Sequence, residues 1–381
     1  MDMHVDMKNF LGLLDEIGPE FAERSMKMAD TDTFAVENIE ALKRYKFYSA
    51  MVPVEFGGGG VTHSEMCAII RKLAGFCPST ALTLSMHQHI IGANRWNHQR
   101  GNPGQALLEK VAAKELVLVS TGANDWLSSS GEVEKTEGGY LVSAKKGFAS
   151  GSPAGDLAIT SAPYEDPEAG WQVLHFPVLM NTEGVSIIEN WQAMGMRNTG
   201  SNLIVFDKVF VPEENIGVRR PRGAFHPMWN VVLTVALPLI MSAYQGIADA
   251  AAGIARDRAK NALGDPHLPY LLGEMENAFT TSEVAYESMV AIANNLNFDP
   301  VVENADNILK RKTIISNAVK EVTAKAMELS GGPGFTRATR LEQFFRDAQA
   351  SQFHPLSEKK QVHFSGRLAM GLDPIDLTGK D

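Results

Sequence analysis

The apolar positions of this chain change their spacing twice along its length. Up to about residue 115 they recur at intervals of three or four residues, as Ile39 and Leu42 do, and this spacing predicts helices. Between residues 116 and 218 they form short Val- and Ile-rich runs separated by Gly, Pro and Asp, which predicts strands. Helical spacing then returns in long segments. The pattern therefore predicts an α+β fold in the order helices, strands, helices.

Local signals refine this outline. Thr62 and Glu65 form a capping box that predicts a helix start, and Gly138-Gly139 between two strand-like runs predicts a hairpin. The regular spacing of turns favours an antiparallel barrel or sandwich. The long C-terminal stripes predict a packed helical bundle. We expect an N-terminal helical domain over residues 1–115, a β-domain over 116–222 and a bundle over 223–381.

Residues 223–248 carry no charged side chain and approach the length of a membrane span. Asn230, Pro238, Ser242 and Gln245 interrupt the segment. We favour the alternative of a helix buried on all sides in a bundle, and we expect no membrane partner.

Composition narrows the partners. The 381 residues carry a formal net charge of −10, which argues against nucleic acid. Cys67 and Cys77 read as reduced thiols, and the acidic N-terminus without a long apolar run favours a cytoplasmic protein. His87 and His89 would point to different sides of a helix, so we expect no metal. No GxGxxG follows a strand, so electrons from a nicotinamide would have to arrive by another route.

Three segments are more specific: "VPVEFGGGG", "GMRNTGSNLIVFDKVFVPEE" and "SGGPGFTRATRLEQFFRDA". In this order, across nearly the whole chain, they resemble the acyl-CoA dehydrogenase superfamily. The resemblance implies that the C-terminal bundle has four helices and that a flavin lies between it and the β-domain. It also implies an oligomer, a homotetramer or homodimer, in which neighbouring subunits complete the site.

The resemblance assigns cofactor residues by position. Phe148, Ala149 and Ser150 match the aromatic–x–Ser/Thr element beside the flavin ring. The flavin pyrimidine would be bound by the backbone of the segment that contains Ser120, Thr121, Gly122 and Asn124. Gly331 and Gly332 match paired glycines that approach the cofactor of a neighbouring subunit, and Lys260 replaces an arginine on the cofactor phosphate. The weaker phosphate grip favours a diffusible flavin, either FAD or FMN.

One departure changes the expected chemistry. The position of the family's catalytic glutamate is Pro355, and a second position used by some members falls at Ala236 and Leu237. None of these three residues can remove a proton. His354 precedes the proline instead, and "FHPL" and "FASG" resemble flavin-dependent monooxygenases of the same fold. In those enzymes a separate reductase supplies the reduced flavin.

We therefore predict a monooxygenase that uses reduced flavin and O2 on a small aromatic, heteroaromatic or amino substrate. His354 would handle a proton, Ser150 would donate a hydrogen bond near the flavin, and His87 would face the substrate. Two alternatives remain open: an acyl-CoA dehydrogenase with a displaced base such as Glu358, and a non-catalytic member that binds flavin or a partner. His354 and Ser150 would then be structural.

Overall fold

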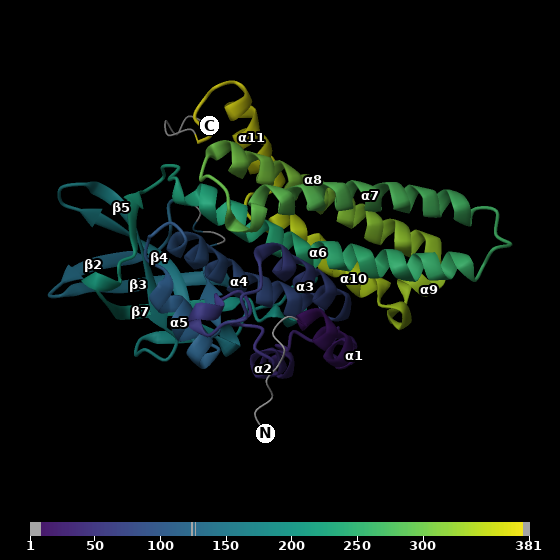
Figure 1. The fold of residues 1–381 in the computed structure, drawn as a ribbon, viewed down its shortest axis with the longest axis horizontal. Helices are drawn as coiled ribbons and strands as arrows, with labels where there is room; N and C mark the ends of the chain where they lie inside the picture. Colours follow the sequence, from purple (N-terminus) through teal and green to yellow (C-terminus); the bar gives the residue numbers. More distant parts are fainter. Residues whose placement is uncertain (1–8, 123–124, 126, 376–381) are drawn as a thin grey trace.

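The computed structural model describes residues 9–122, 125 and 127–375. Its elements follow the predicted order of helices, strands and helices, which confirms the α+β class (Figure 1). The N-terminal helices are α1 (Phe10–Met28), α2 (Val36–Arg44), α3 (His63–Phe76), α4 (Pro78–His98) and α5 (Gln105–Lys114). The strands are β1 (Leu118–Ser120), β2 (Glu132–Thr136), β3 (Gly139–Ala149), β4 (Leu157–Asp166), β5 (Gly170–Leu179), β6 (Val185–Ile188), β7 (Asn202–Pro212) and β8 (Val218–Pro221). The C-terminal helices are α6 (Met228–Lys260), α7 (Leu268–Ala293), α8 (Val302–Ser330), α9 (Gly332–Phe335), α10 (Leu341–Ala348) and α11 (Glu358–Ala369).

The strands form two sheets of four strands each, in the orders β1-β4-β5-β8 and β2-β3-β7-β6. The predicted hairpin joins β2 to β3, with Thr136 paired to Gly139. One expectation was incomplete, because β1 pairs with β4 in parallel and the first sheet is therefore mixed. Since β1 enters directly from α5, its direction is set by the helical domain, which no short-range pattern in the strands records. Apolar residues of both sheets, among them Tyr140, Phe176 and Phe206, form one core.

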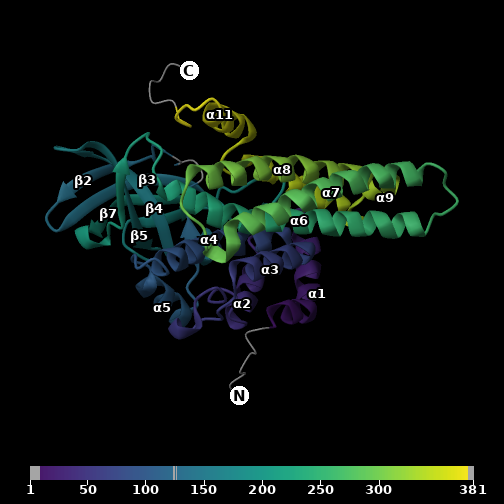
Figure 2. The ribbon, with the colours of Figure 1, turned by 45° about the horizontal axis from the view of Figure 1, so that its top comes forward.

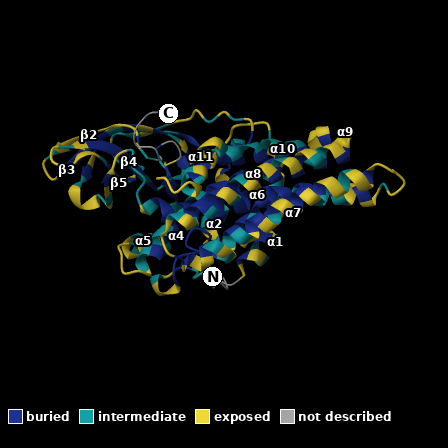
Figure 3. Ribbon diagram, turned by 90° about the horizontal axis from the view of Figure 1, so that it is seen from above, coloured by how far each residue is buried: buried dark blue, intermediate teal, exposed yellow. Residues whose placement is uncertain are grey.

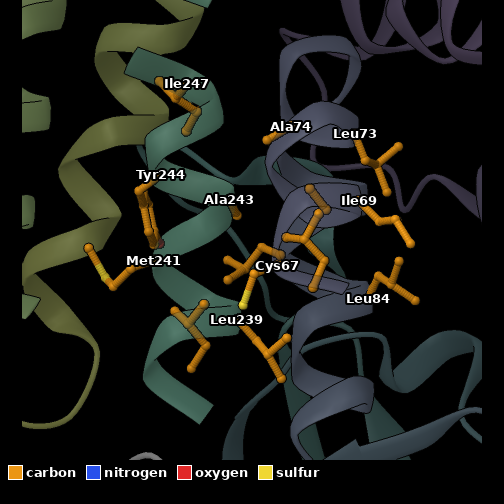
Figure 4. Packing of buried hydrophobic residues seen from close by; sticks show 14 of the residues in the cluster. Cys67, Ile69, Leu73, Ala74, Leu84, Leu239, Met241, Ala243, Tyr244 and Ile247 are labelled. Carbon is orange, nitrogen blue, oxygen red and sulfur yellow. The ribbon is translucent and has the colours of Figure 1, made fainter. Parts of the chain in front are cut away.

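The charge-free segment is the central helix of the bundle. α6 is long and apolar enough to cross a membrane, the one such helix among the described residues, yet 94% of its most apolar window is buried in the protein. It packs on α3, α4, α7 and α8. Figure 4 shows Ala243 on the side that faces α3 and Tyr244 on the opposite side. Helix α6 therefore belongs to the core shared by the N-terminal helices and the bundle.

The two ends of the molecule differ. In Figures 1 and 2 the strands lie at one end, and the turn between α6 and α7 lies at the other end beside α9. Figure 3 shows buried residues along the middle of the bundle and exposed ones at that far turn. The capping box at Thr62 is present, with Glu65 bonded back to the Thr62 backbone and side chain. The site residues predicted from the sequence lie at both ends of the structure.

Candidate active site at the junction of three regions

The end of β3 presents an aromatic ring. Phe148 has a positive φ of 58° and is 49% exposed, so its side chain turns out of the strand instead of into the core. Its ring meets Trp191 edge to face, with centroids 6.0 Å apart. Ala149 is fully buried behind it. An open apolar face at a strand end suits the flat ring of a flavin, so these residues fit the cofactor that the sequence implies.

Behind Phe148, three hydroxyl groups form a chain. Ser150 Oγ lies 2.8 Å from Ser201 Oγ, which lies 2.7 Å from Thr199 Oγ1. Thr199 donates to the carbonyl of Met196 at 2.9 Å. Because Thr199 gives its hydrogen to Met196, Ser201 donates to Thr199 and Ser150 donates to Ser201. Ser150 therefore offers a lone pair to a molecule outside the chain. The sequence favoured a donor at Ser150, whereas this network already uses its hydrogen.

The "GMRNTGS" turn ties these hydroxyls to the rest of the molecule. The Met196 amide donates to Asp347 Oδ1 on α10 at 2.5 Å, and Arg197 pairs with Asp32 at 2.8 Å. The side-chain amide of Asn198 donates to three carbonyls at the end of α1 and in the segment that follows it. They belong to Met28 (3.2 Å), Thr31 (3.1 Å) and Thr33 (2.9 Å). The turn therefore joins the N-terminal helices, the β-domain and the bundle at one place.

The segment predicted to bind the flavin pyrimidine follows β1. Ser120 ends β1 and is half-buried, Thr121 donates its hydroxyl to Thr160 at 2.7 Å, and Gly122 is exposed. Asn124 lies outside the described residues. Asp125 is held by the ammonium group of the buried Lys146 on β3, which also donates to the Ser130 carbonyl at 2.6 Å. Because Lys146 is two residues before Phe148, the same strand anchors both cofactor segments.

His354 lies in the bundle, against α6. Its Nε2 is 2.6 Å from the hydroxyl of Tyr244, and the two rings meet at 5.4 Å between centroids. Burial, with a contribution from Lys312, lowers the pKa of His354 to about 3, so the imidazole is neutral at neutral pH. Burial likewise raises the pKa of the Tyr244 hydroxyl, which keeps its proton. The pair therefore works as a neutral hydrogen-bonded unit and not as a reservoir for a proton.

The carboxylates near His354 do not replace the missing glutamate. Glu358 begins α11, its side chain is 42% exposed, and it accepts a hydrogen bond from Asn317 at 3.3 Å. Ala236 and Leu237 are buried apolar residues of α6. Asp347 is buried, and burial raises its pKa to about 6, but one of its oxygens is committed to the Met196 amide. A general base positioned for a thioester is thus not evident among the described residues.

His87 takes a different place from the one expected. It is fully buried in α4, where Nε2 donates to the Tyr48 carbonyl at 2.8 Å and Nδ1 accepts from the Leu118 amide at 3.0 Å. Burial lowers its pKa to about 3. Both nitrogens are used by backbone groups, so the ring has no nitrogen left for a substrate. It holds α4 to β1, and we leave it out of the proposal below.

The remaining predicted cofactor residues lie at the other end of the bundle. Lys260 ends α6, is exposed, and has its ammonium group 3.5 Å from Asp257. Gly331 has a φ of 61°, and a Cβ on Gly331 or Gly332 would meet nothing within 4 Å. In Figure 1 this end lies away from the strands. One chain therefore does not bring these residues to Phe148. Both glycines therefore lie at an open surface.

Sequence reasoning missed Trp191 and Tyr244. Trp191 lies shortly before the "GMRNTGS" motif, and its residue type does not indicate its partner. Tyr244 lies in the charge-free helix, and a single phenol in an apolar run is the only sequence signal for it. Among the described residues, no cluster of three or more His, Cys, Asp or Glu side chains could hold a metal ion.

Comparison with known proteins gives two family matches. The N-terminal domain of acyl-CoA dehydrogenases matches residues 15–115, and their C-terminal domain matches residues 233–354. L-evernosamine nitrososynthase of Micromonospora sp. is 27% identical, over 95% of this chain and 89% of the relative. The flavin-dependent monooxygenase oxygenase subunit HsaA of Rhodococcus jostii is 25% identical, over 92% and 95% respectively.

A solved structure shares the fold over nearly its full length. It is KijD3 in complex with FMN and a dTDP-linked amino-keto sugar, with a TM-score of 0.86 and 21% identity over 97% of this chain and 95% of that one. Acyl-CoA dehydrogenases are also among the relatives, at 22–24% identity. The relatives therefore divide between oxygenation and dehydrogenation chemistry.

Proposed function

The chain belongs to the acyl-CoA dehydrogenase superfamily, and on that basis we propose that it is a flavin-dependent monooxygenase that acts with reduced flavin and O2. One observation carries the proposal. The segment in which the dehydrogenases hold their catalytic glutamate here presents a neutral imidazole, His354, bonded to the phenol of Tyr244. Without a carboxylate base, removal of a proton beside a thioester loses its essential group.

The chain's own residues suit the alternative chemistry. Phe148, Trp191 and Ser150 would hold a reduced flavin, which would supply electrons to O2. Phe148 and Trp191 form an open apolar face that a bound flavin would cover and so shield from water. His354 presents a neutral nitrogen that accepts or donates a hydrogen bond to a phenol or amine without storing charge. Tyr244 fixes the ring that does so.

Several further parts of the proposal rest on the relatives. HsaA is named as an oxygenase subunit, which supports a separate reductase for this chain too. The FMN in KijD3 supports FMN as readily as FAD. The nitrososynthase and the amino-keto sugar support an amino substrate alongside an aromatic one. Lys260, Gly331 and Gly332 at the far end of the bundle support a homo-oligomer, because only another copy brings them to a shared cofactor.

The test separates the proposal from its rival in one preparation. The purified protein receives FMN or FAD, reduced by an added reductase, with 18O2 and a panel of phenols, indoles and nucleotide-linked amino sugars. Mass spectrometry should find one labelled oxygen atom in a product. A parallel anaerobic sample receives oxidised flavin and acyl-CoAs. Flavin bleaching there, with no labelled product in the first arm, would show that the chain is a dehydrogenase.

A matched variant ties the result to the site. Tyr244→Phe removes one hydroxyl and leaves His354 Nε2 without its partner. Loss of a hydrogen bond to a buried group costs ~1–3 kcal/mol, so we expect labelled product to fall roughly 5- to 150-fold. A product yield unchanged in this variant would remove the pair from the mechanism.

A further inference from the structure

The segment that carries His354 is held by a buried lysine of α8. Lys312 is 1% exposed, and its ammonium group donates to the carbonyls of Leu356 at 3.1 Å and Gln352 at 3.3 Å. These two carbonyls lie two residues after and two residues before His354. The ammonium group therefore closes the base of the short loop that presents the imidazole.

No carboxylate among the described residues forms an ion pair with this ammonium group. Among the ion pairs of the described residues Lys312 has none, whereas its neighbour Lys310 pairs with Asp306. Burial lowers the pKa of Lys312 to about 8, Lys320 acts in the same sense, and Glu358 opposes them. A buried ammonium group without a counter-ion is costly, so its cost must be offset by the carbonyls that it binds.

A second contact lies one turn further along the same face of α8. Ser316 Oγ is 2.7 Å from Ser351 Oγ, and both side chains are buried. Residues four apart on a helix lie on one face, so Lys312 and Ser316 act on the same segment from a rigid element. Together they hold Ser351, Gln352 and Leu356, and so fix the chain on both sides of His354.

From this arrangement we propose that Lys312 is a positioning residue that holds residues 352–356 on α8 and so keeps the His354 imidazole on the Tyr244 hydroxyl. The inference rests on the proposed function only for the importance of His354. The anchoring itself concerns this chain's own groups. The charge of Lys312 also faces the imidazole, so the same lysine disfavours a proton on His354 while Tyr244 occupies its Nε2.

The test measures the loop directly. Hydrogen–deuterium exchange followed by mass spectrometry compares the wild type with Lys312→Met, which keeps the length of the side chain but removes its donors. We expect exchange in the peptide spanning residues 349–357 to rise roughly tenfold, while α6 and α7 keep their protection. Lys310→Met, on the same helix, is the matched control and should leave this peptide unchanged. Equal exchange in the wild type and Lys312→Met would overturn the proposal.

A second readout reports the imidazole itself. With selectively labelled histidine, and His354→Gln to assign its signal, NMR should show His354 titrating at a higher pH in Lys312→Met than in the wild type. The groups facing this ring are Lys312 and Tyr244, and those facing Lys312 are Lys320 and Glu358. An unchanged titration would refute the electrostatic part. Burial also lowers the pKa of His354, so a loosened loop would raise it as well. Lys312→Gln separates the two causes, because it removes the charge and keeps a donor: an equal shift in both variants assigns the effect to the charge.

The failure of this inference and the failure of the proposed function are distinguishable. If Lys312→Met does not fold, Lys312→Gln, which keeps a shorter donor, should show intermediate exchange, and exchange equal to the wild type would again overturn the proposal. If no substrate is oxygenated while the loop loosens as expected, the anchor stands and the monooxygenase proposal fails. If labelled product forms equally well in the wild type and the Lys312 variants, the anchor has no bearing on the reaction.

Discussion

Replacing Asn198 with aspartate tests the junction on which the site depends. The Asn198 side chain is buried, and its Nδ2 faces three carbonyl oxygens at the end of α1 and in the segment that follows it, at 2.9–3.2 Å. An aspartate of the same shape turns an oxygen towards those three oxygens. The two hydrogens of the amide are shared among the three carbonyls, and losing these hydrogen bonds costs ~1–3 kcal/mol. The uncompensated buried charge raises the total to ~3–5 kcal/mol.

The matched control is Asn202→Asp in the same region. Asn202 is also buried, but its Oδ1 accepts hydrogen bonds from the amides of Asn190 and Trp191 at 3.1 and 3.0 Å. An aspartate there keeps the acceptor. We therefore expect Asn202→Asp to cost far less than Asn198→Asp, although both introduce the same charge.

The assay is urea unfolding followed by circular dichroism at pH 7.5 and 5.0, with hydrogen exchange over residues 28–35. The destabilisation from Asn198→Asp should shrink at pH 5.0, because a carboxyl surrounded by carbonyls takes up a proton and regains one donor. Exchange over residues 28–35 should rise. Equal losses for Asn198→Asp and Asn202→Asp would refute the reasoning, since charge alone would then explain both.

Three further predictions concern buried groups away from His354. Acidification from pH 7.5 to 5.0 should lower the free energy of unfolding by ~2 kcal/mol for each of His63 and His87, because their unfolded imidazoles, with a pKa of ~6.5, take up protons that the folded ones do not. Burial lowers their folded pKa values to about 4 and about 3, and an unchanged urea midpoint would contradict this. Lys146→Met should cost ~3–5 kcal/mol by leaving Asp125 unpaired, and adding Asp125→Asn should recover part of that loss; no recovery would argue against the ion pair. Gly246→Ala should lower the melting temperature, because the new Cβ would lie 2.0 Å from an α3 carbonyl, and an unchanged melting curve would exclude this close approach.

Much of the architecture followed from local patterns. The apolar spacing predicted the order of helices and strands, and the capping box at Thr62 and the hairpin at Gly138-Gly139 are both present. These signals are local, because a cap or a turn is made by residues within four positions of one another. The parallel pairing of β1 with β4 was not predicted, since it joins segments about 40 residues apart.

The sequence by itself determined the elements, the resemblance to the family and the loss of the glutamate at Pro355, because each is a property of residue type and short spacing. Only the tertiary structure decided what the chemistry-bearing residues do. It joined Tyr244 to His354 across 110 positions and Met196 to Asp347 across 151. It also surrounded His87 with backbone groups and removed it from the site. A hydrogen bond depends on distance and direction in space, and a side chain's sequence position carries neither.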